Sequence, residues 1–299
     1  MLGTDTAPGG MVGVSMMRRN FARDVFIYGA IVPLCAFAML PLIWAGISAL
    51  KPLEDVYVFP PSFSVSDPQW SNFYEAVTRL PICRFLLNST LITLTSVMGA
   101  VLTSSMAGFA LARLAFRGRK LCFAVVLVSM LIPTQVLLIP RFLLYDVLGW
   151  IDTYKPLIVP AWLGGGAFNV FLFRQFFRTI PLAMDEAACL DGATPWQTYW
   201  HVLLPIARPA TVTAFLLSFV FHWQDFLDPL IYLSDFTTYP ISVGLRMYQS
   251  LAGTWANLLM AASLIALVPV AVVFLLCERH IMQGLGVIRA DGRREVQEP

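Results

Sequence analysis

A polar stretch with closely spaced carboxylates interrupts the apolar chain between Pro181 and Pro209, and reads PLAMDEAACLDGATPWQTYWHVLLPIARP. Asp185 and Glu186 lie near the start of a predicted short helix, where negative charge suits the positive end of the helix dipole. Gly192 follows that helix and is well placed to adopt the left-handed backbone that ends it. The chemistry this pattern offers is polar or ionic contact from a carboxylate held beside a sharp turn.

A second helix is predicted to begin directly after the turn. Thr194, Pro195 and Gln197 have the spacing of a capping box with proline at the first helical position. Pro205 is predicted to end this helix. The apolar residues recur at i, i+3, i+4 and i+7 and form one stripe: Trp196, Tyr199, Trp200 and Leu203. On residue types alone, the stretch is a connector whose stripe rests on a bilayer surface or on neighbouring helices.

Other residue types that could do chemistry are isolated from one another. His201, His222 and His280 lie far apart and form no HExxH pattern, so the sequence predicts no metal, no cofactor and no catalytic residue. Residues 164–166 are three glycines without the Lys-Ser/Thr of a phosphate loop, and they are predicted to permit close helix approach or local unwinding. The cysteines are scattered singly and are interpreted as small apolar fillers: Cys35, Cys83, Cys122, Cys189 and Cys277.

The bulk composition places the chain in a bilayer. Of its 299 residues, 58% are hydrophobic and 13% are charged, and the mean hydropathy is +0.72. These three values together lie outside the range of an ordinary soluble domain. A net charge of +2 without a basic stripe gives no indication of nucleic-acid binding.

The apolar runs predict an all-α polytopic membrane protein with six transmembrane helices. The first run is too long for a cleaved signal peptide and is read as a retained span. Pro133 and Pro140 are predicted to bend or end the third span. A cytoplasmic extension is predicted at 1–24 and a cytoplasmic tail at 278–299. The expected spans are residues 25–50, 85–111, 121–139, 156–173, 210–233 and 255–277, with the polar loop at 181–209.

The distribution of basic residues predicts the orientation. With six spans, the side that holds both termini and the polar loop carries 14 of the 20 Lys and Arg residues, and the other side carries 6. Basic residues concentrate in cytoplasmic segments. Both termini and the loop are therefore predicted to face the cytoplasm of a bacterial cell, on the side where ATP is found.

The chain has no ATPase motif of its own, because GxxxxGK[ST] does not occur in the sequence. An ion-coupled carrier would need ionisable groups buried in its spans, and the first four spans and the sixth show almost none. An intramembrane enzyme and a passive channel are alternatives. Uptake measured with and without an ATPase partner would separate these classes.

The spacing of the loop resembles a known motif. Glu186-Ala187-Ala188, three residues, Gly192, nine residues, Val202, one residue and Leu204-Pro205 match the EAA loop of ATP-binding-cassette importer permeases, with Val202 where Ile is usual. The resemblance implies a loop that enters a cleft on a separate ATPase subunit, with a polar contact from Glu186 and the turn at Gly192. Asp191 either caps the helix or joins the contact. The coupling residues so implied are Glu186, Ala187, Ala188, Asp191, Gly192, Leu204 and Pro205.

Most of the chain is similar to the permeases of carbohydrate importers of the maltose (MalG-type) and glycerol-phosphate type. Segments that carry this resemblance include LARLAFRGRK, LIPTQVLLIP and LMAASLIALVPVAVVFLLCERHIMQGL. The tail departs from the family at 286–292. The resemblance implies a sugar substrate, a second similar permease, two ATPase subunits that bind ATP and Mg, and an extracytoplasmic binding protein that contacts the outer loop at 234–254. A non-carbohydrate or glycerol-phosphate-type importer is the alternative.

Four polar or aromatic residues at the outer ends of the last two spans could line a sugar pathway. An aromatic face stacks on a sugar ring while carboxylate and amide groups bond to its hydroxyls. The other interpretation places Trp223 in the interfacial aromatic belt and Asp225 on the outer surface. The candidate pathway residues are Trp223, Gln224, Asp225 and Asn257.

Overall fold

The structure is a computed structural model that describes the backbone of residues 10–250 and 253–294 and the side chains of residues 25–249 and 254–278. Two-residue strands β1 (Gln249–Ser250) and β2 (Gly253–Thr254) pair antiparallel, and otherwise the regular structure is helical. The α-helices are α1 Gly10–Ala49, α2 Leu53–Val56, α3 Ser71–Arg79, α4 Ile82–Arg113, α5 Arg119–Ser129, α6 Leu138–Val147, α7 Lys155–Trp162, α8 Ala167–Thr179, α9 Ala183–Leu190, α10 Pro195–Thr198, α11 Leu204–Ile206, α12 Arg208–Gln224, α13 Leu227–Tyr232, α14 Ile241–Arg246 and α15 Ala256–Arg294.

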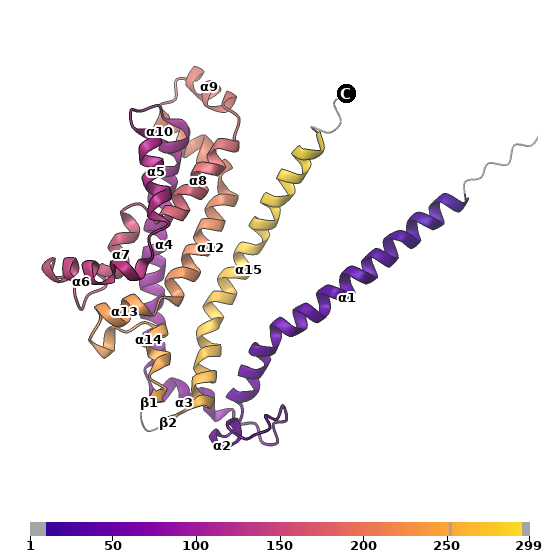
Figure 1. Ribbon diagram of the computed structural model, residues 1–299, viewed down its shortest axis with the longest axis vertical. Coiled ribbons are helices and arrows are strands. Elements are labelled where there is room, and N and C mark those ends of the chain that lie inside the picture. Colours follow the sequence, from indigo (N-terminus) through magenta and orange to yellow (C-terminus); the bar gives the residue numbers. More distant parts are fainter. Residues whose placement is uncertain (1–9, 251–252, 295–299) are drawn as a thin grey trace, which may run out of the picture.

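Helix α4 is the central element, with α7, α8 and α12 packed around it (Figure 1). Its inner face is built of small and apolar residues, and the buried Phe109 meets Phe173 and Phe177 of α8 in one cluster. Polar groups on this face are satisfied across helices, as where Ser96 Oγ donates to the Leu157 carbonyl at 3.1 Å. The core therefore follows the length of α4.

Four helical segments are long and apolar enough to cross a membrane: Val25–Ala49, Ile82–Arg113, Lys155–Thr179 (α7 with α8) and Ala256–Glu278. The count rises to six if each of two bent helix pairs is one span. The predicted class, an all-α polytopic membrane protein, is confirmed. The total of six spans depends on how the bent pairs are counted.

The structure divides the predicted third span, 121–139, at a proline. Helix α5 ends at Ser129, and the segment from Thr134 to Val147 leaves it at 95°. The 11 residues of α5 rise about 16 Å, roughly half of a hydrocarbon core. Pro133 lies in the break as predicted, whereas Pro140 lies inside α6 and does not end it.

The glycine triplet at 164–166 separates α7 from α8, and all three residues have positive φ. A Cβ added to Gly165 would lie 2.0 Å from the carbonyl oxygen of Ala100 on α4. Local unwinding and close helix approach, the two roles predicted for these glycines, are both present.

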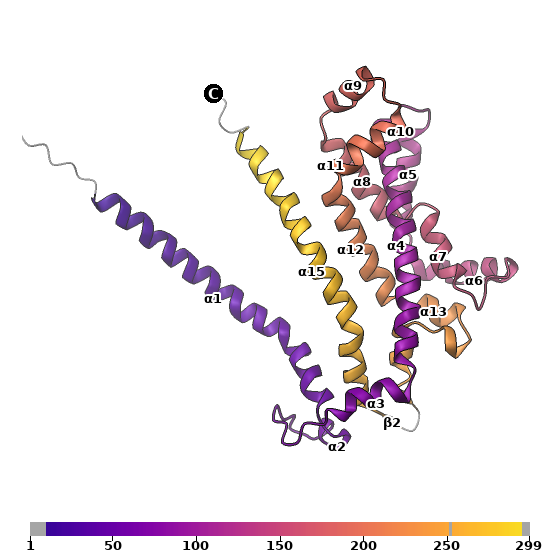
Figure 2. The same ribbon diagram turned by 180° about the vertical axis from the view of Figure 1, so that it is seen from behind.

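Helix α12 ends at Gln224, and a short separate helix, α13, occupies the rest of the predicted fifth span. Helix α1 begins at Gly10, inside the predicted extension at 1–24, and α15 continues to Arg294 in the predicted tail. Residues 1–9 and 295–299 of those two segments lie outside the described residues. Helices α1 and α15 lean away from the main body, and α15 ends toward the end that carries α9 (Figure 2).

Candidate functional site

The first helix of the polar loop, α9, ends in a left-handed glycine. Gly192 has a φ of +80°. Its N–H donates to the Cys189 carbonyl at 3.0 Å, and the next N–H, of Ala193, donates to the Ala188 carbonyl at 2.9 Å. These two bonds form a Schellman motif. A Cβ at Gly192 would meet nothing within 4 Å, so backbone conformation rather than space favours glycine here.

The second helix begins with the predicted capping box. Thr194 Oγ1 accepts from the Gln197 N–H at 3.3 Å, and Gln197 Oε1 accepts from the Thr194 N–H at 2.8 Å. The helix ends at Ile206, one residue beyond the predicted end at Pro205, and it contains a π turn over Tyr199–Leu203. The wider turn accommodates the proline ring and its missing N–H. The chain then bends by 78° into α12.

Tyr199 joins the loop to the helical body. Its side chain is fully buried, its hydroxyl lies 2.7 Å from Ser105 Oγ on α4, and its ring lies 5.1 Å from that of Phe109. Trp196 stacks on the Tyr199 ring and Trp200 meets it edge-on, but the two side chains remain 52% and 37% exposed. Through Tyr199, the apolar stripe of the second helix therefore packs against α4 of the same chain.

A second link, which sequence reasoning missed, joins α9 to the end of α4. Arg113 Nη2 donates to the Ile180 carbonyl at 2.7 Å and lies 3.5 Å from Asp185 Oδ2. The Arg113 side chain is 6% exposed and that of Asp185 is 25% exposed. In the sequence, Arg113 is visible only as a basic residue at the end of a span. The usual excess of basic residues in cytoplasmic segments already explains such a residue, so it gave no indication of the contact.

The loop projects beyond the helical body at one end of the molecule (Figure 1). Leu190 is 89% exposed at the end of α9. Among the predicted coupling residues, Glu186, Ala187, Asp191, Gly192 and Pro205 are exposed, Leu204 is half-buried and Ala188 is buried. The exposed face of the loop thus combines carboxylates with apolar side chains. The turn at Gly192 and the buried Tyr199 hold this face in place.

This arrangement is suited to docking. Among the described residues, no group of three or more His, Cys, Asp and Glu could hold a metal ion. The one histidine of the loop, His201, places Nδ1 3.1 Å from the Gln197 carbonyl of its own helix. The available chemistry is charge and apolar contact with another molecule.

Two of the candidate pathway residues are engaged inside the chain. Trp223 is 5% exposed, stacks on Phe219 and donates its indole N–H to the Ala266 carbonyl at 3.2 Å. Asn257 is 8% exposed and donates to Asn72 Oδ1 at 3.2 Å. In this conformation both polar groups hold helices together, and Trp223 lies in the core rather than in an exposed belt.

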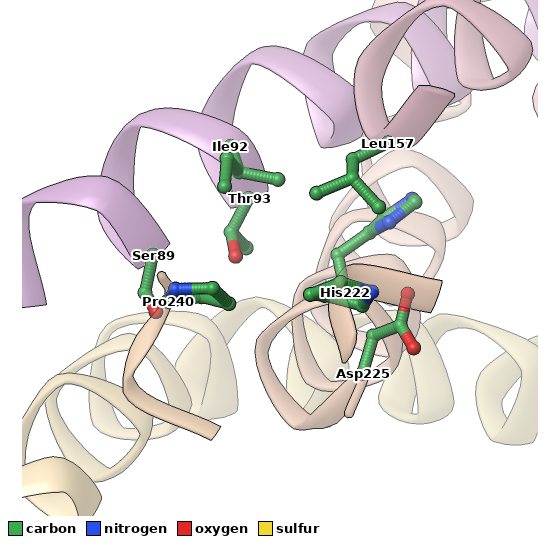
Figure 3. Close-up of a pocket in the computed structure, with 8 residues that line it drawn as sticks. Ser89, Ile92, Thr93, Leu157, His222, Asp225 and Pro240 are labelled. Carbon is green, nitrogen blue, oxygen red and sulfur yellow. The ribbon is translucent and has the colours of Figure 1, made fainter. Parts of the chain in front are cut away.

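The other two pathway residues lie near the end of α12. Gln224 is exposed and lines an open groove. Asp225 shares a cavity of about 10 Å³ with His222 and with Thr93 of α4 (Figure 3), and its Oδ1 accepts from the Asp228 N–H at 3.3 Å. Such a volume is comparable with the space one water molecule needs, so it is too small for a sugar in this conformation.

The described part of the predicted outer loop, residues 234–250 and 253–254, lies toward the end of the molecule opposite α9 (Figure 1). Asn88 Nδ2 on α4 donates to the carbonyls of Thr237 and Tyr239, both at 3.0 Å. Asp152 Oδ1 accepts from the Ser234 N–H at 2.8 Å. These bonds hold the first part of the loop in a defined shape on the start of α4.

Comparisons with known proteins agree with this architecture. The maltose/maltodextrin permease MalG of Yersinia pestis is 32% identical, covering 69% of each chain. The sn-glycerol-3-phosphate permease UgpE of Agrobacterium fabrum is 30% identical, covering 89% of this chain and 95% of UgpE. The sulfoquinovosyl glycerol permease SmoH of the same organism is 29% identical, covering 83% and 87%.

A solved structure shows the same fold. A bacterial ABC transporter involved in import of the acidic polysaccharide alginate superposes with a TM-score of 0.74 at 20% identity, covering 93% of this chain and 99% of that one. Residues 99–285 match the family model described as binding-protein-dependent transport system inner membrane component. The chain therefore belongs to this family, which confirms the resemblance seen in its sequence.

Proposed function

We propose that this chain is the membrane-spanning permease subunit of an ATP-driven importer and that its substrate is a carbohydrate. Its relatives are named for maltose and maltodextrin, sulfoquinovosyl glycerol and arabinooligosaccharides. A di- or oligosaccharide, or a related carbohydrate, fits this range. Glycerol phosphate is the second candidate, because permeases named for it are similar over about nine-tenths of this chain.

The energy for transport comes from a separate subunit in this proposal. The sequence has no phosphate-binding GxxxxGK[ST] segment, so ATP and Mg would bind to a partner. The proposed assembly contains this chain, a second similar permease, two ATPase subunits and an extracytoplasmic binding protein that contacts the outer loop at 234–254. The permease itself catalyses no reaction.

The observation that carries the proposal is the projecting helix α9 with its hydrogen-bonded turn at Gly192. Glu186 and Asp191 are exposed on it, and Gly192 fixes the angle at which it meets α10. We assign Glu186 a polar contact with the ATPase. Ala187 is exposed and permits close approach of the ATPase, whereas Ala188 is buried. Leu204 and Pro205 join the second helix to α12.

Two contacts would carry motion of α9 into the membrane. Arg113 holds Ile180 and Asp185 at the end of α4, and Tyr199 reaches Ser105 of the same helix. Ser105 and Arg113 are about 12 Å apart along the axis at 1.5 Å per residue. Because the loop contacts α4 at two points along its length, a displacement of α9 would tilt α4 and the helices packed on it.

The proposed orientation follows from the basic residues. In the six-span arrangement, the side that would hold α9 and both ends of the chain carries 14 of the 20 Lys and Arg residues, and such segments remain on the cytoplasmic side. In this orientation the loop faces the cytosolic ATPase, and the outer loop faces the binding protein.

The substitution Gly192→Val tests the coupling role. A β-branched residue in a left-handed conformation is strained by about 1–2 kcal/mol or more, which corresponds to about a tenfold shift in conformer population. ATP-driven sugar uptake by the assembled complex is expected to fall about tenfold, with ATP hydrolysis retained.

Gly149→Val is the matched control, because Gly149 has φ of +64° and open space around it, and it lies between α6 and α7, outside the loop. Uptake by Gly149→Val is expected to stay near wild type. Near-normal uptake by Gly192→Val, in membranes containing equal amounts of the complex, would remove the proposed role.

A further inference from the structure

The small cavity beside Asp225 lies between α4 and the end of α12 (Figure 3). Helix α4 contributes Ser89 and Thr93, and α12 contributes His222 near its last turn. Asp225 is the first residue after α12, and Leu157 of α7 adds an apolar wall. The space for the centre of a water molecule is about 10 Å³, which is close to the minimum that one water needs.

Thr93 brings a polar group without a partner to this cavity. Its side chain is 1% exposed, and its Oγ1 has no hydrogen-bond partner among the described residues. Other threonines of α4 donate to the carbonyl four residues earlier, as Thr90, Thr95 and Thr103 do at 2.6–2.8 Å. Because the Thr93 hydroxyl does not use that acceptor, it needs a partner in the cavity itself.

Three further polar groups line the same space. Ser89 Oγ accepts from the Ile241 N–H at 2.7 Å, and its own O–H can still donate. Asp225 Oδ1 accepts from the Asp228 N–H at 3.3 Å, and a carboxylate has room for several more donors. The His222 ring adds nitrogens that can donate or accept. A buried water makes about three hydrogen bonds, and these groups supply that number.

The lining groups favour water over a transition metal ion. Of the side chains around the cavity, only His222 and Asp225 are of the kind that bind such metals strongly. Among the described residues, no group of three or more His, Cys, Asp and Glu could hold a metal ion. The combination of a water-sized space, an unpartnered hydroxyl and neighbouring donors and acceptors is typical of a buried water site.

We propose that this cavity binds one ordered water molecule, which accepts from the Thr93 hydroxyl and donates to the Asp225 carboxylate. The water joins α4 to the point where the chain leaves α12 and enters α13. Helix α12 begins directly after the polar loop, so the water would fix the far end of the helix that the loop enters. The proposal is independent of the transported substrate and of the ATPase.

A structure of the full chain in this conformation, at a resolution that shows ordered solvent, tests the site directly. One peak is expected at about 2.5–3.0 Å from both Thr93 Oγ1 and a carboxylate oxygen of Asp225. The proposal is wrong if that position has no peak in a map that shows water at other buried sites. A peak with the octahedral oxygen coordination of a cation would also overturn it.

Thr93→Val gives an independent test, because valine has nearly the same shape as threonine and no hydroxyl. If water is bound, the substitution removes one of its hydrogen bonds. The melting temperature of the purified full chain in detergent is then expected to fall by about 2–4 °C. If the cavity is dry, valine instead removes an unsatisfied buried hydroxyl. The melting temperature would then rise or stay the same, which would contradict the proposal.

Thr90→Val is the matched control. Thr90 lies three residues earlier on the same helix, is exposed, and donates its hydroxyl to the Leu86 carbonyl at 2.7 Å. Its melting temperature should stay near that of wild type, and an equal fall in Thr90→Val would overturn the assignment to the cavity. Thr93→Ser keeps the hydroxyl, so its structure should retain the peak that Thr93→Val loses.

Discussion

At the scale of single residues, Arg113 is the group that ties the start of the loop to the end of α4. Its side chain is nearly buried, it bonds the carbonyl that precedes α9, and its Nε has no hydrogen-bond partner among the described residues. A buried guanidinium is stable only where it finds acceptors. Arg113 therefore holds the loop in position, while the exposed residues of the loop would contact a partner.

Arg113→Gln and Asp185→Asn are expected to differ in effect. Losing a charged hydrogen bond to Ile180 costs about 1.5–3 kcal/mol, whereas the partly exposed pair with Asp185 at 3.5 Å contributes about 0–1 kcal/mol. Arg113→Gln should lower the thermal stability of the purified chain and its sugar uptake more than Asp185→Asn does. Thermal unfolding and uptake check this, and the reverse order would contradict the proposed anchor.

At the scale of elements, the break between α7 and α8 sets how closely α8 approaches α4. Gly165 lies against the Ala100 carbonyl, and the Asn169 side-chain amide donates to the Gly165 carbonyl and to Ser218 Oγ, both at 2.8 Å. One short segment thus connects α8 with α4 and α12. Any added volume at Gly165 must separate helix backbones, which cannot rotate away as a side chain can.

Gly165→Ala is expected to destabilise the chain far more than Gly166→Ala. Both positions have positive φ, so both substitutions incur about 1–2 kcal/mol of backbone strain. Only Gly165→Ala adds a clash with backbone, at a typical further cost of about 1–3 kcal/mol. Thermal unfolding in detergent with both variants measures the difference, and equal melting temperatures would show that the close approach is unimportant.

Elements governed by local sequence were predictable, and those governed by distant partners were not. Gly192, the cap at Thr194 and the break at 164–166 each depend on a few neighbouring residues, and the structure confirms them. The burial of Tyr199 depends on a partner far away in the sequence, since its hydroxyl bonds to Ser105, 94 positions away.

The same distinction applies to the candidate pathway. Trp223 and Asn257 have side chains suited to a sugar, and nothing in their local sequence indicated that Ala266 and Asn72 would occupy them. Residue type suggests what a group can bind, but the packing of other helices decides what it does bind.

At the scale of the whole molecule, the chain separates two kinds of surface. The end with α9 carries the projecting loop, and the opposite end carries α2, α3, α14 and the paired strands β1 and β2 (Figure 1). An importer needs contacts of different kinds on the two sides of the membrane. Two native cysteines mark these ends, since Cys189 is exposed on α9 and Cys83 is exposed at the start of α4.

The most direct measurement of the central claim is modification of Cys189 by a membrane-impermeant maleimide, in a variant whose other cysteines are serine. Without the ATPase subunit, the account predicts modification in inside-out vesicles and none in intact cells, and a variant with Cys83 alone should show the reverse. With the ATPase subunit assembled, Cys189 should become protected. Arg117→Cys, at an exposed position in the connection between α4 and α5, should stay reactive in the cysteine-free background. Modification of Cys189 from outside intact cells, or unchanged reactivity in the assembled complex, would contradict the account.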